Sequence, residues 1–174
     1  VWRGPMATGA LMQMLNQTRW GALDYLVVDM PPGTGDIQLT LAQKASMAGA
    51  VIVTTPQDIA LLDARKAIEM FGKVKIPVLG IVENMAMHRC SQCGHEEPIF
   101  GEGGGQRVAA QYHTEVLGSL PLDRLIREQV DGGRPSVIAE PEGSVAQRYG
   151  EIAARIAVIL AGIDRSGGPQ ITIE

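Results

Sequence analysis

The run Val78-Leu79-Gly80-Ile81-Val82 is apolar without interruption and is followed by polar residues, which is the pattern of a strand buried on both faces. Strands of this kind, rather than alternating ones, are typical of a parallel sheet covered by helices. Three further runs share the pattern, the last of them more weakly: Tyr25-Leu26-Val27-Val28, Ala50-Val51-Ile52-Val53 and Glu115-Val116-Leu117-Gly118. The sequence therefore predicts a mostly parallel sheet.

Stretches with helical periodicity lie between and around these runs. In residues 145–160, for example, Ile152, Ile156 and Leu160 recur at four-residue steps. Alternation of strands and helices predicts an α/β fold, a doubly wound sheet with helices on both faces. The expected helices cover residues 5–19, 37–48, 59–73, 105–112, 121–130 and 145–160.

The domain organisation follows from length and composition. We expect one domain over residues 1–163 and a flexible tail over 164–174, which contains Ser166-Gly167-Gly168-Pro169. The chain begins at Val1 in the middle of a pattern, and the strand expected before the first helix would precede it. We therefore expect an N-terminally truncated form of the fold.

Charge and hydropathy exclude several classes of function. A net charge of −4 offers no basic stripe for nucleic acid, and no apolar run reaches the roughly 20 residues that span a bilayer. Two cysteines in a polar stretch fit a reducing compartment. The expected location is the cytoplasm, with no nucleic acid and no membrane as partners.

The only two cysteines form the motif Cys90-Ser91-Gln92-Cys93 in a polar, turn-rich stretch that predicts a loop. Zinc and iron–sulfur sites commonly use four ligands, so one chain supplies half of a thiolate site. A second copy across a two-fold axis would complete it, which predicts a homodimer with a metal centre at its interface.

Two other interpretations of the cysteine pair stay open. One is a redox dithiol, although such motifs stand at helix N-termini rather than in loops. The other is a zinc site within one chain that adds His88 or His95, although His95 lies only two residues beyond Cys93.

Ligands of open α/β sheets bind at the carboxyl ends of the strands. The first predicted strand ends in Asp29, and Pro32 and Gly33 follow shortly after it. In P-loop NTPases, a strand that ends in this way places a carboxylate near magnesium and a backbone amide near the γ-phosphate. An aspartate that only caps a turn would look the same.

Two later strand ends offer walls for a nucleotide base. Asn84 can present its amide to a base edge or satisfy the backbone of its own loop, and Pro121-Leu122-Asp123 can line a pocket or open a helix. The phosphate-binding loop G-x-x-x-x-G-K-[ST] is absent from the printed sequence, so we expect no ATP hydrolysis by this chain unaided.

Together these motifs resemble the Mrp/ApbC family of iron–sulfur cluster carriers, which are deviant Walker A P-loop ATPases related to MinD and the nitrogenase iron protein. The resemblance runs from Val1 to about Leu160. It rests on Val1 to Met6, Asp24 to Asp36, Val53 to Gln57, Glu83 to Met85 and the Cys90-x-x-Cys93-Gly94 motif.

The resemblance implies a role for each candidate residue. Cys90 and Cys93 would bridge a [4Fe–4S] cluster with the same pair of a second subunit, for delivery to recipient apoproteins. Asp29 to Gly33 would sense magnesium and the γ-phosphate, with Asp29 as the catalytic residue, and Asn84 and Pro121-Leu122-Asp123 would contact the adenine of ATP. An alternative from another class is a MinD-like positioning or scaffold ATPase with structural zinc at the dimer interface.

Overall fold

The computed structural model describes residues 4–30, 35–90 and 92–163. A parallel sheet forms its centre, with strand order β1-β2-β5. The strands are β1 (Ala50–Thr54), β2 (Val78–Glu83) and β5 (Val116–Ser119), within one or two residues of the predicted runs. Their registers align Thr54, Glu83 and Ser119, so all three carboxyl ends meet at one edge of the sheet.

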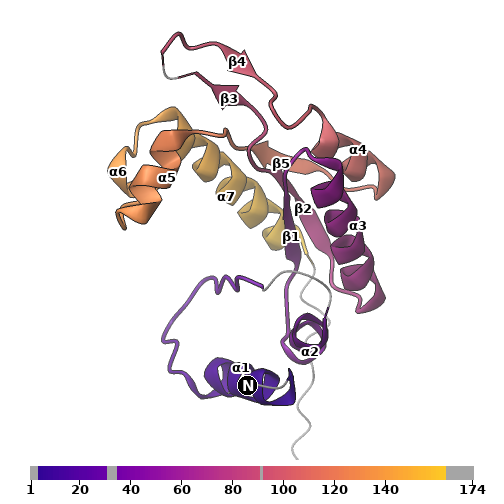
Figure 1. Ribbon diagram of the computed structural model, residues 1–174. Helices are drawn as coiled ribbons and strands as arrows, with labels where there is room; N and C mark the ends of the chain where they lie inside the picture. The colour runs from indigo at the N-terminus through magenta and orange to yellow at the C-terminus, as the bar shows by residue number, and fades with distance from the viewer. Residues whose placement is uncertain (1–3, 31–34, 91, 164–174) are drawn as a thin grey trace, which may run out of the picture.

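Helices cover both faces of this sheet (Figure 1). Helices α3 (Asp58–Lys73) and α4 (Gly104–Gln111) pack on one face, where Ile81 and Val108 are fully buried. Helix α7 (Ser144–Gly162) packs on the other face through Ile152. Burying one such side chain contributes about 1.5–3 kcal/mol, so the two apolar layers hold the sheet and fix which residues face each layer. The predicted doubly wound α/β fold is confirmed.

The remaining helices lie at the periphery. Helix α1 (Gly4–Gln17) packs against α2 (Asp36–Lys44) below the sheet in Figure 1. Helices α5 (Arg124–Asp131) and α6 (Ser136–Ala139) lie beside α7, and α6 was not predicted because four residues are too few to show periodicity.

The predicted strand Tyr25-Leu26-Val27-Val28 is wrong. These residues form no strand and make no ladder, and Val27 is 90% exposed. A strand is stable only when its backbone N–H and C=O groups pair with a neighbour, and no described strand runs beside this segment. Apolar and β-branched composition alone therefore did not suffice to make residues 25–28 a strand.

The predicted loop around the cysteines contains a short antiparallel pair, β3 (His88–Arg89) with β4 (Glu96–Glu97). We call residues 88–97 the cysteine hairpin. It projects from the carboxyl edge of the sheet, at the top of Figure 1 and at the opposite end of the molecule from α1.

Two helix boundaries also differ from the prediction. Helix α2 ends at Lys44 instead of Ala48, since Ala45 is already extended and the chain then turns into β1. Helix α5 begins at Arg124 instead of Pro121, because the residues before it pair with the segment that leads into the cysteine hairpin.

Candidate functional site

The cysteine hairpin holds its two thiols on one turn. The Cys90 N–H donates to the His95 carbonyl over 2.8 Å, and the Gly94 N–H donates to the Cys90 carbonyl over 2.9 Å. Cys90 is half-buried, Cys93 is exposed, and both are free thiols. The turn therefore presents two thiols at or near the surface of the molecule.

The turn also favours the thiolate of Cys90. A hydrogen bond from the Cys93 backbone is the main cause of a lowered pKa for Cys90, with smaller contributions from the Gln92 backbone and the Cys93 side chain. Burial and the negative charge of Glu97 oppose this shift only in part. Since the thiolate is the form that binds metal, the direction of the pKa shift suits a metal ligand.

One chain does not assemble a closed metal site among its described residues. No group of three or more His, Cys, Asp or Glu side chains in that part of the chain is placed to hold a metal ion. His88 instead has its ring Nδ1 3.2 Å from the Leu122 carbonyl oxygen, and His95 is exposed. The zinc site within one chain is therefore not formed here, and the cysteine pair stands on a hairpin rather than at the helix N-terminus of a redox dithiol.

The two predicted base-contacting segments lie side by side. The Leu120 N–H donates to the Glu83 carbonyl, the Ala86 N–H to the Leu120 carbonyl, and the Leu122 N–H to the Met87 carbonyl, over 2.9–3.0 Å. Residues 83–88 and 120–122 thus form a continuous backbone-paired surface that begins at the carboxyl edge of the sheet.

Within this surface, the polar side chains also have structural roles. Asn84 Oδ1 accepts a hydrogen bond from the Met85 N–H over 2.9 Å and so supports the positive φ of 54° at Met85. Asp123 caps α5 by accepting from the Leu125 N–H over 2.7 Å. The local alternative considered for Asn84 is therefore present, whereas Pro121 does not open a helix, since α5 begins at Arg124. Contact of these residues with a base stays a prediction.

A cavity of about 620 Å³ opens between the cysteine hairpin, α4 and α7. Pro121 and Asp123 line it together with Leu120 and Ser119, whereas Asn84 and Leu122 are not among its lining residues. Its volume is within the range of small-molecule sites. The charged side chains that line the cavity come from the end of β2, the hairpin, the loop before α4, the N-cap of α5 and helix α7: Glu83, Arg89, Glu96, Glu102, Asp123 and Arg148.

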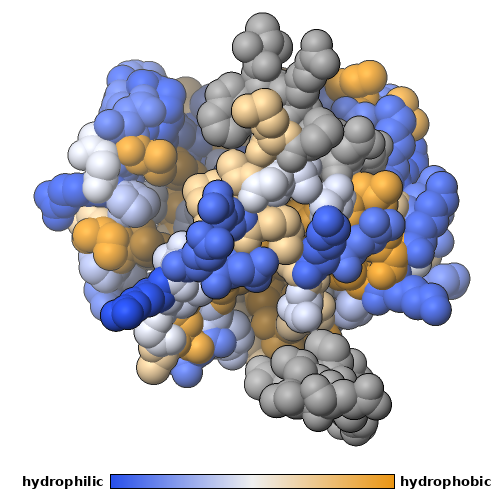
Figure 2. Space-filling model, turned by 90° about the horizontal axis from the view of Figure 1, so that it is seen from below, coloured by the Kyte–Doolittle hydropathy of each residue, from blue (hydrophilic) through white to orange (hydrophobic). Residues whose placement is uncertain are grey.

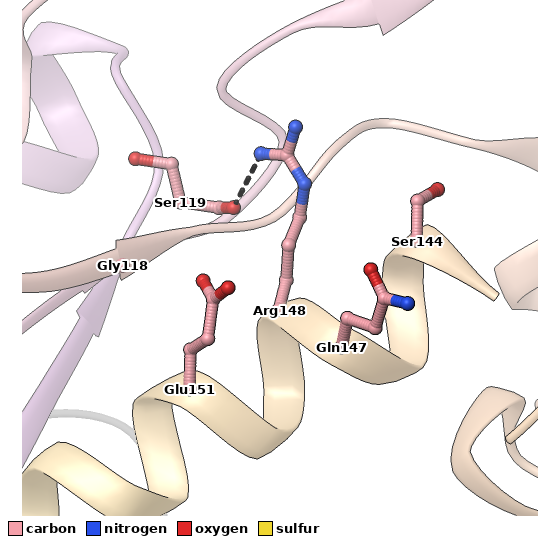
Figure 3. A pocket seen from close by; sticks show the side chains of 6 residues that line it. All are labelled: Gly118, Ser119, Ser144, Gln147, Arg148 and Glu151. Carbon is pink, nitrogen blue, oxygen red and sulfur yellow. Dashed lines mark hydrogen bonds between the residues drawn. The ribbon is translucent and has the colours of Figure 1, made fainter. Parts of the chain in front are cut away.

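A smaller cavity of about 340 Å³ adjoins the outer edge of β5 (Figure 3). Arg148 of α7 lines both cavities and donates to the Ser119 carbonyl over 3.1 Å. Arg155, one heptad later, donates to the Val116 and Leu117 carbonyls. These arginines of α7 thus donate to backbone carbonyl groups of β5.

Of the predicted magnesium and γ-phosphate residues, the structure describes Asp29, which does not line either cavity. Asp29 is exposed at the end of the segment that forms no strand, so its expected place at a strand terminus is not observed. Pro32 and Gly33 lie outside the described residues. This part of the prediction stays untested.

Sequence reasoning missed the role of Glu83. The side chain is 3% exposed, and its Oε2 accepts a hydrogen bond from the Gly105 N–H at the start of α4. An acidic residue that directly continues an apolar run was a visible signal, but the interpretation of Glu83-Asn84-Met85 considered only Asn84.

Comparison with known proteins decides the family. Residues 1–157 match the model of the NUBPL iron-transfer P-loop NTPases, within the ParA group. The chain belongs to this family. Among its curated relatives, the iron–sulfur cluster carrier protein of Pseudomonas fragi is 67% identical over 153 residues, 88% of this chain and 53% of that protein. The carrier of Escherichia coli K12 is 62% identical over 92% of this chain and 43% of its own length.

This NUBPL-type chain spans about half the length of the curated carriers that it matches. Among solved structures, the nucleotide-binding protein of Archaeoglobus fulgidus, determined in complex with ADP, is 41% identical with a TM-score of 0.70, over 82% of this chain and 57% of that one. The MinD cell division ATPase of Pyrococcus furiosus is 21% identical with a TM-score of 0.60, over 87% of this chain and 57% of that one.

The MinD likeness shows a common fold, and the MinD-like scaffold alternative is not favoured by the curated relatives, which are cluster carriers. Among the described helices of this family member, none combines the length and hydrophobicity that crossing a membrane requires.

Proposed function

We propose that this chain is the cluster-bearing part of an iron–sulfur carrier, in which Cys90 and Cys93 bind a [4Fe–4S] cluster shared with the same residues of a second subunit. The observation that carries the proposal is the cysteine hairpin. It presents two thiols on one turn, lowers the pKa of Cys90, and has no third protein ligand beside them among the described residues. Four thiolates, two from each subunit, complete such a site.

The surface position of the turn supports transfer rather than storage. Cys93 is exposed and Cys90 only half-buried, so a cluster held there is accessible to the thiols of a recipient apoprotein. Membership of an iron-transfer family whose curated relatives are cluster carriers supports the same role. We place this exchange in the cytoplasm, where thiols stay reduced.

The chain's residues fit the base end of an ATP site. The paired segments 83–88 and 120–122 and the adjoining cavity offer polar groups and apolar walls, in which Asn84 and Pro121-Leu122-Asp123 are proposed to contact adenine. Asp29 and the Pro32-Gly33 amides are proposed to hold Mg²⁺ and sense the γ-phosphate. Binding and hydrolysis of ATP are proposed for a polypeptide that also contains a phosphate-binding loop, since the printed sequence has no such motif.

Metal analysis after anaerobic reconstitution tests the cluster assignment. Iron, acid-labile sulfide and zinc are measured per chain, together with the mass of the complex, in the wild type and in Cys90→Ser and Cys93→Ser. We expect about two irons and two sulfides per chain in a dimer, and loss of both in each variant.

Zinc at about half an equivalent per chain without sulfide would instead support a structural zinc at the dimer interface. Iron retained by both serine variants would remove the cysteine hairpin from the proposal altogether.

A further inference from the structure

We infer that Glu83 is the positioning residue that holds the cysteine hairpin on the carboxyl edge of the sheet. This inference rests on the proposed function, because it assigns the residue that places the two cluster ligands. Glu83 is the single acidic residue among the buried residues that the structure describes. It is not one of the proposed metal or nucleotide contacts.

The chain that carries the cysteines is closed into a loop by this residue. It leaves β2 at Glu83, runs through the cysteine hairpin, and returns to the sheet as α4. There the Gly105 N–H donates to Glu83 Oε2. Both ends of segment 84–104 are therefore fastened to Glu83, one by the peptide bond and the other by its carboxylate.

The backbone of Glu83 is itself firmly held. It is in register with Thr54 on one side and Ser119 on the other, and its carbonyl accepts from the Leu120 N–H over 2.9 Å. The next residue, Asn84, donates its N–H to the Thr54 carbonyl over 2.7 Å. The central strand β2 is thus held on both sides and provides a fixed anchor for the segment that carries the hairpin.

The start of α4 is shaped to receive the carboxylate. A Cβ atom built on Gly105 would lie 3.0 Å from Glu83 Oε2 and 3.3 Å from Glu83 Cβ, so glycine permits this close approach. The N-terminus of a helix favours negative charge, which offsets part of the cost of burying it. The carboxylate of Glu83 and the start of α4 at Gly105 are therefore complementary in shape and charge, although the two residues are far apart in the sequence.

The opposite end of α4 provides a matched control. The Tyr112 hydroxyl, just after α4, donates to Glu69 of α3 over 2.8 Å. Glu69→Ala therefore also removes a carboxylate that holds α4, but at the end remote from the cysteine hairpin. A general loosening of α4 would affect both variants, whereas a positioning role belongs to Glu83 alone.

The test compares Glu83→Ala, Glu83→Gln and Glu69→Ala by amide hydrogen exchange of residues 84–105 and by alkylation rates of Cys90 and Cys93 in the metal-free chain. We expect Glu83→Ala to speed exchange at Gly105 and across the hairpin about tenfold to a hundredfold, which is the loss expected for a hydrogen bond to a charged group. We expect Glu83→Gln, which keeps an acceptor oxygen, to restore most of the protection, and Glu69→Ala to leave the hairpin unchanged.

Gly105→Ala keeps the position testable if Glu83→Ala does not fold. The added Cβ would lie 3.0 Å from Glu83 Oε2, so the carboxylate has to shift away from the start of α4, and we expect hairpin exchange to rise in the same direction as in Glu83→Ala. Equal hairpin exchange and cysteine alkylation in the Glu83 variants and in Glu69→Ala would overturn the inference.

Reconstitution separates the two proposals. If the wild-type chain takes up no iron, the cluster assignment fails, while hydrogen exchange still decides the role of Glu83. If the wild type takes up iron and Glu83→Ala retains as much of it as Glu69→Ala, the cluster assignment stands and the positioning role is wrong.

Discussion

Cys90 is stabilised as a thiolate by the turn that carries it. Donors from the backbone and side chain of Cys93 and from the backbone of Gln92 lower its pKa. Thiol reactivity and metal affinity both follow the fraction of thiolate. The pH dependence of Cys90 reactivity therefore tests whether the turn lowers the pKa of this thiol.

Alkylation of Cys90 by iodoacetamide should reach half its maximal rate at a lower pH than alkylation of cysteine in an unstructured peptide. The lowered pKa means that the thiolate is already populated below the ordinary titration range, and that it is lost when the pH falls through the folded value. The rate is measured against pH in Cys93→Ser, which leaves Cys90 as the only thiol and keeps the backbone donor of position 93.

Glu97→Gln should move that midpoint further down, because the charge of Glu97 raises the pKa of Cys90. Glu142→Gln, a loop position outside the hairpin, is the control. An unchanged midpoint in Glu97→Gln, or a midpoint equal to that of the peptide, would show that the turn does not act on the thiol as described.

At the element scale, β2 is the strand on which the site depends. It pairs with β1 on one side and β5 on the other, and its last residue is Glu83. Its register against β1 shifts before Gly80, where φ is +153°. A side chain at Gly80 would meet Leu117 Cγ at 2.5 Å and the Glu115 carbonyl oxygen at 2.9 Å, so β2 and β5 approach closely only because this residue is glycine.

Gly80→Ala should lower the free energy of unfolding by about 1–3 kcal/mol, since the methyl group meets backbone as well as side chain. Urea unfolding followed by circular dichroism measures the effect. Gly150→Ala within α7 is the control, because a methyl group there meets no atom within 4 Å and alanine favours a helix. Equal midpoints for the two variants would contradict the close β2–β5 packing.

At the scale of the whole molecule, several large apolar side chains are exposed, and Figure 2 shows apolar patches between hydrophilic residues on one face. Val27 is 90% exposed, Ile59 72% and Val53, on the edge strand β1, 64%. Exposed apolar surface next to an unpaired strand edge favours association with other apolar surface. We therefore expect the isolated chain to self-associate through its exposed apolar surface.

The 174-residue chain should bind the dye ANS under native conditions and associate as its concentration rises. The double variant Val27→Ser and Val53→Thr should reduce both effects without lowering the melting temperature, because neither side chain belongs to a buried cluster. Dye fluorescence and light scattering measure this. A sharp, cooperative melt with no dye binding by the wild-type chain would contradict the expectation.

Much of the fold was predictable because the burial of a strand or helix appears in the sequence as a local pattern of apolar residues. The apolar run that became β2 is buried on both faces, those that became β1 and β5 are partly buried, and the helical periods that became α3 and α7 are buried on one face. The cysteine pair was equally visible, since its spacing alone requires two thiols on one turn. Most strands and helices, the doubly wound class and the pair of thiols on one turn were thus determined by the sequence.

The tertiary structure decided what depends on a partner distant in the chain. Tyr25 to Val28 has the composition of a strand but no described neighbour to complete its hydrogen bonds, whereas the weaker run at 115–118 became β5 because β2 lies beside it. Pro121 did not open a helix because residues 120–122 pair with the segment that follows Glu83. Glu83 acquired its role in the same way, since a carboxylate can be buried only where folding brings a donor such as the Gly105 N–H to meet it.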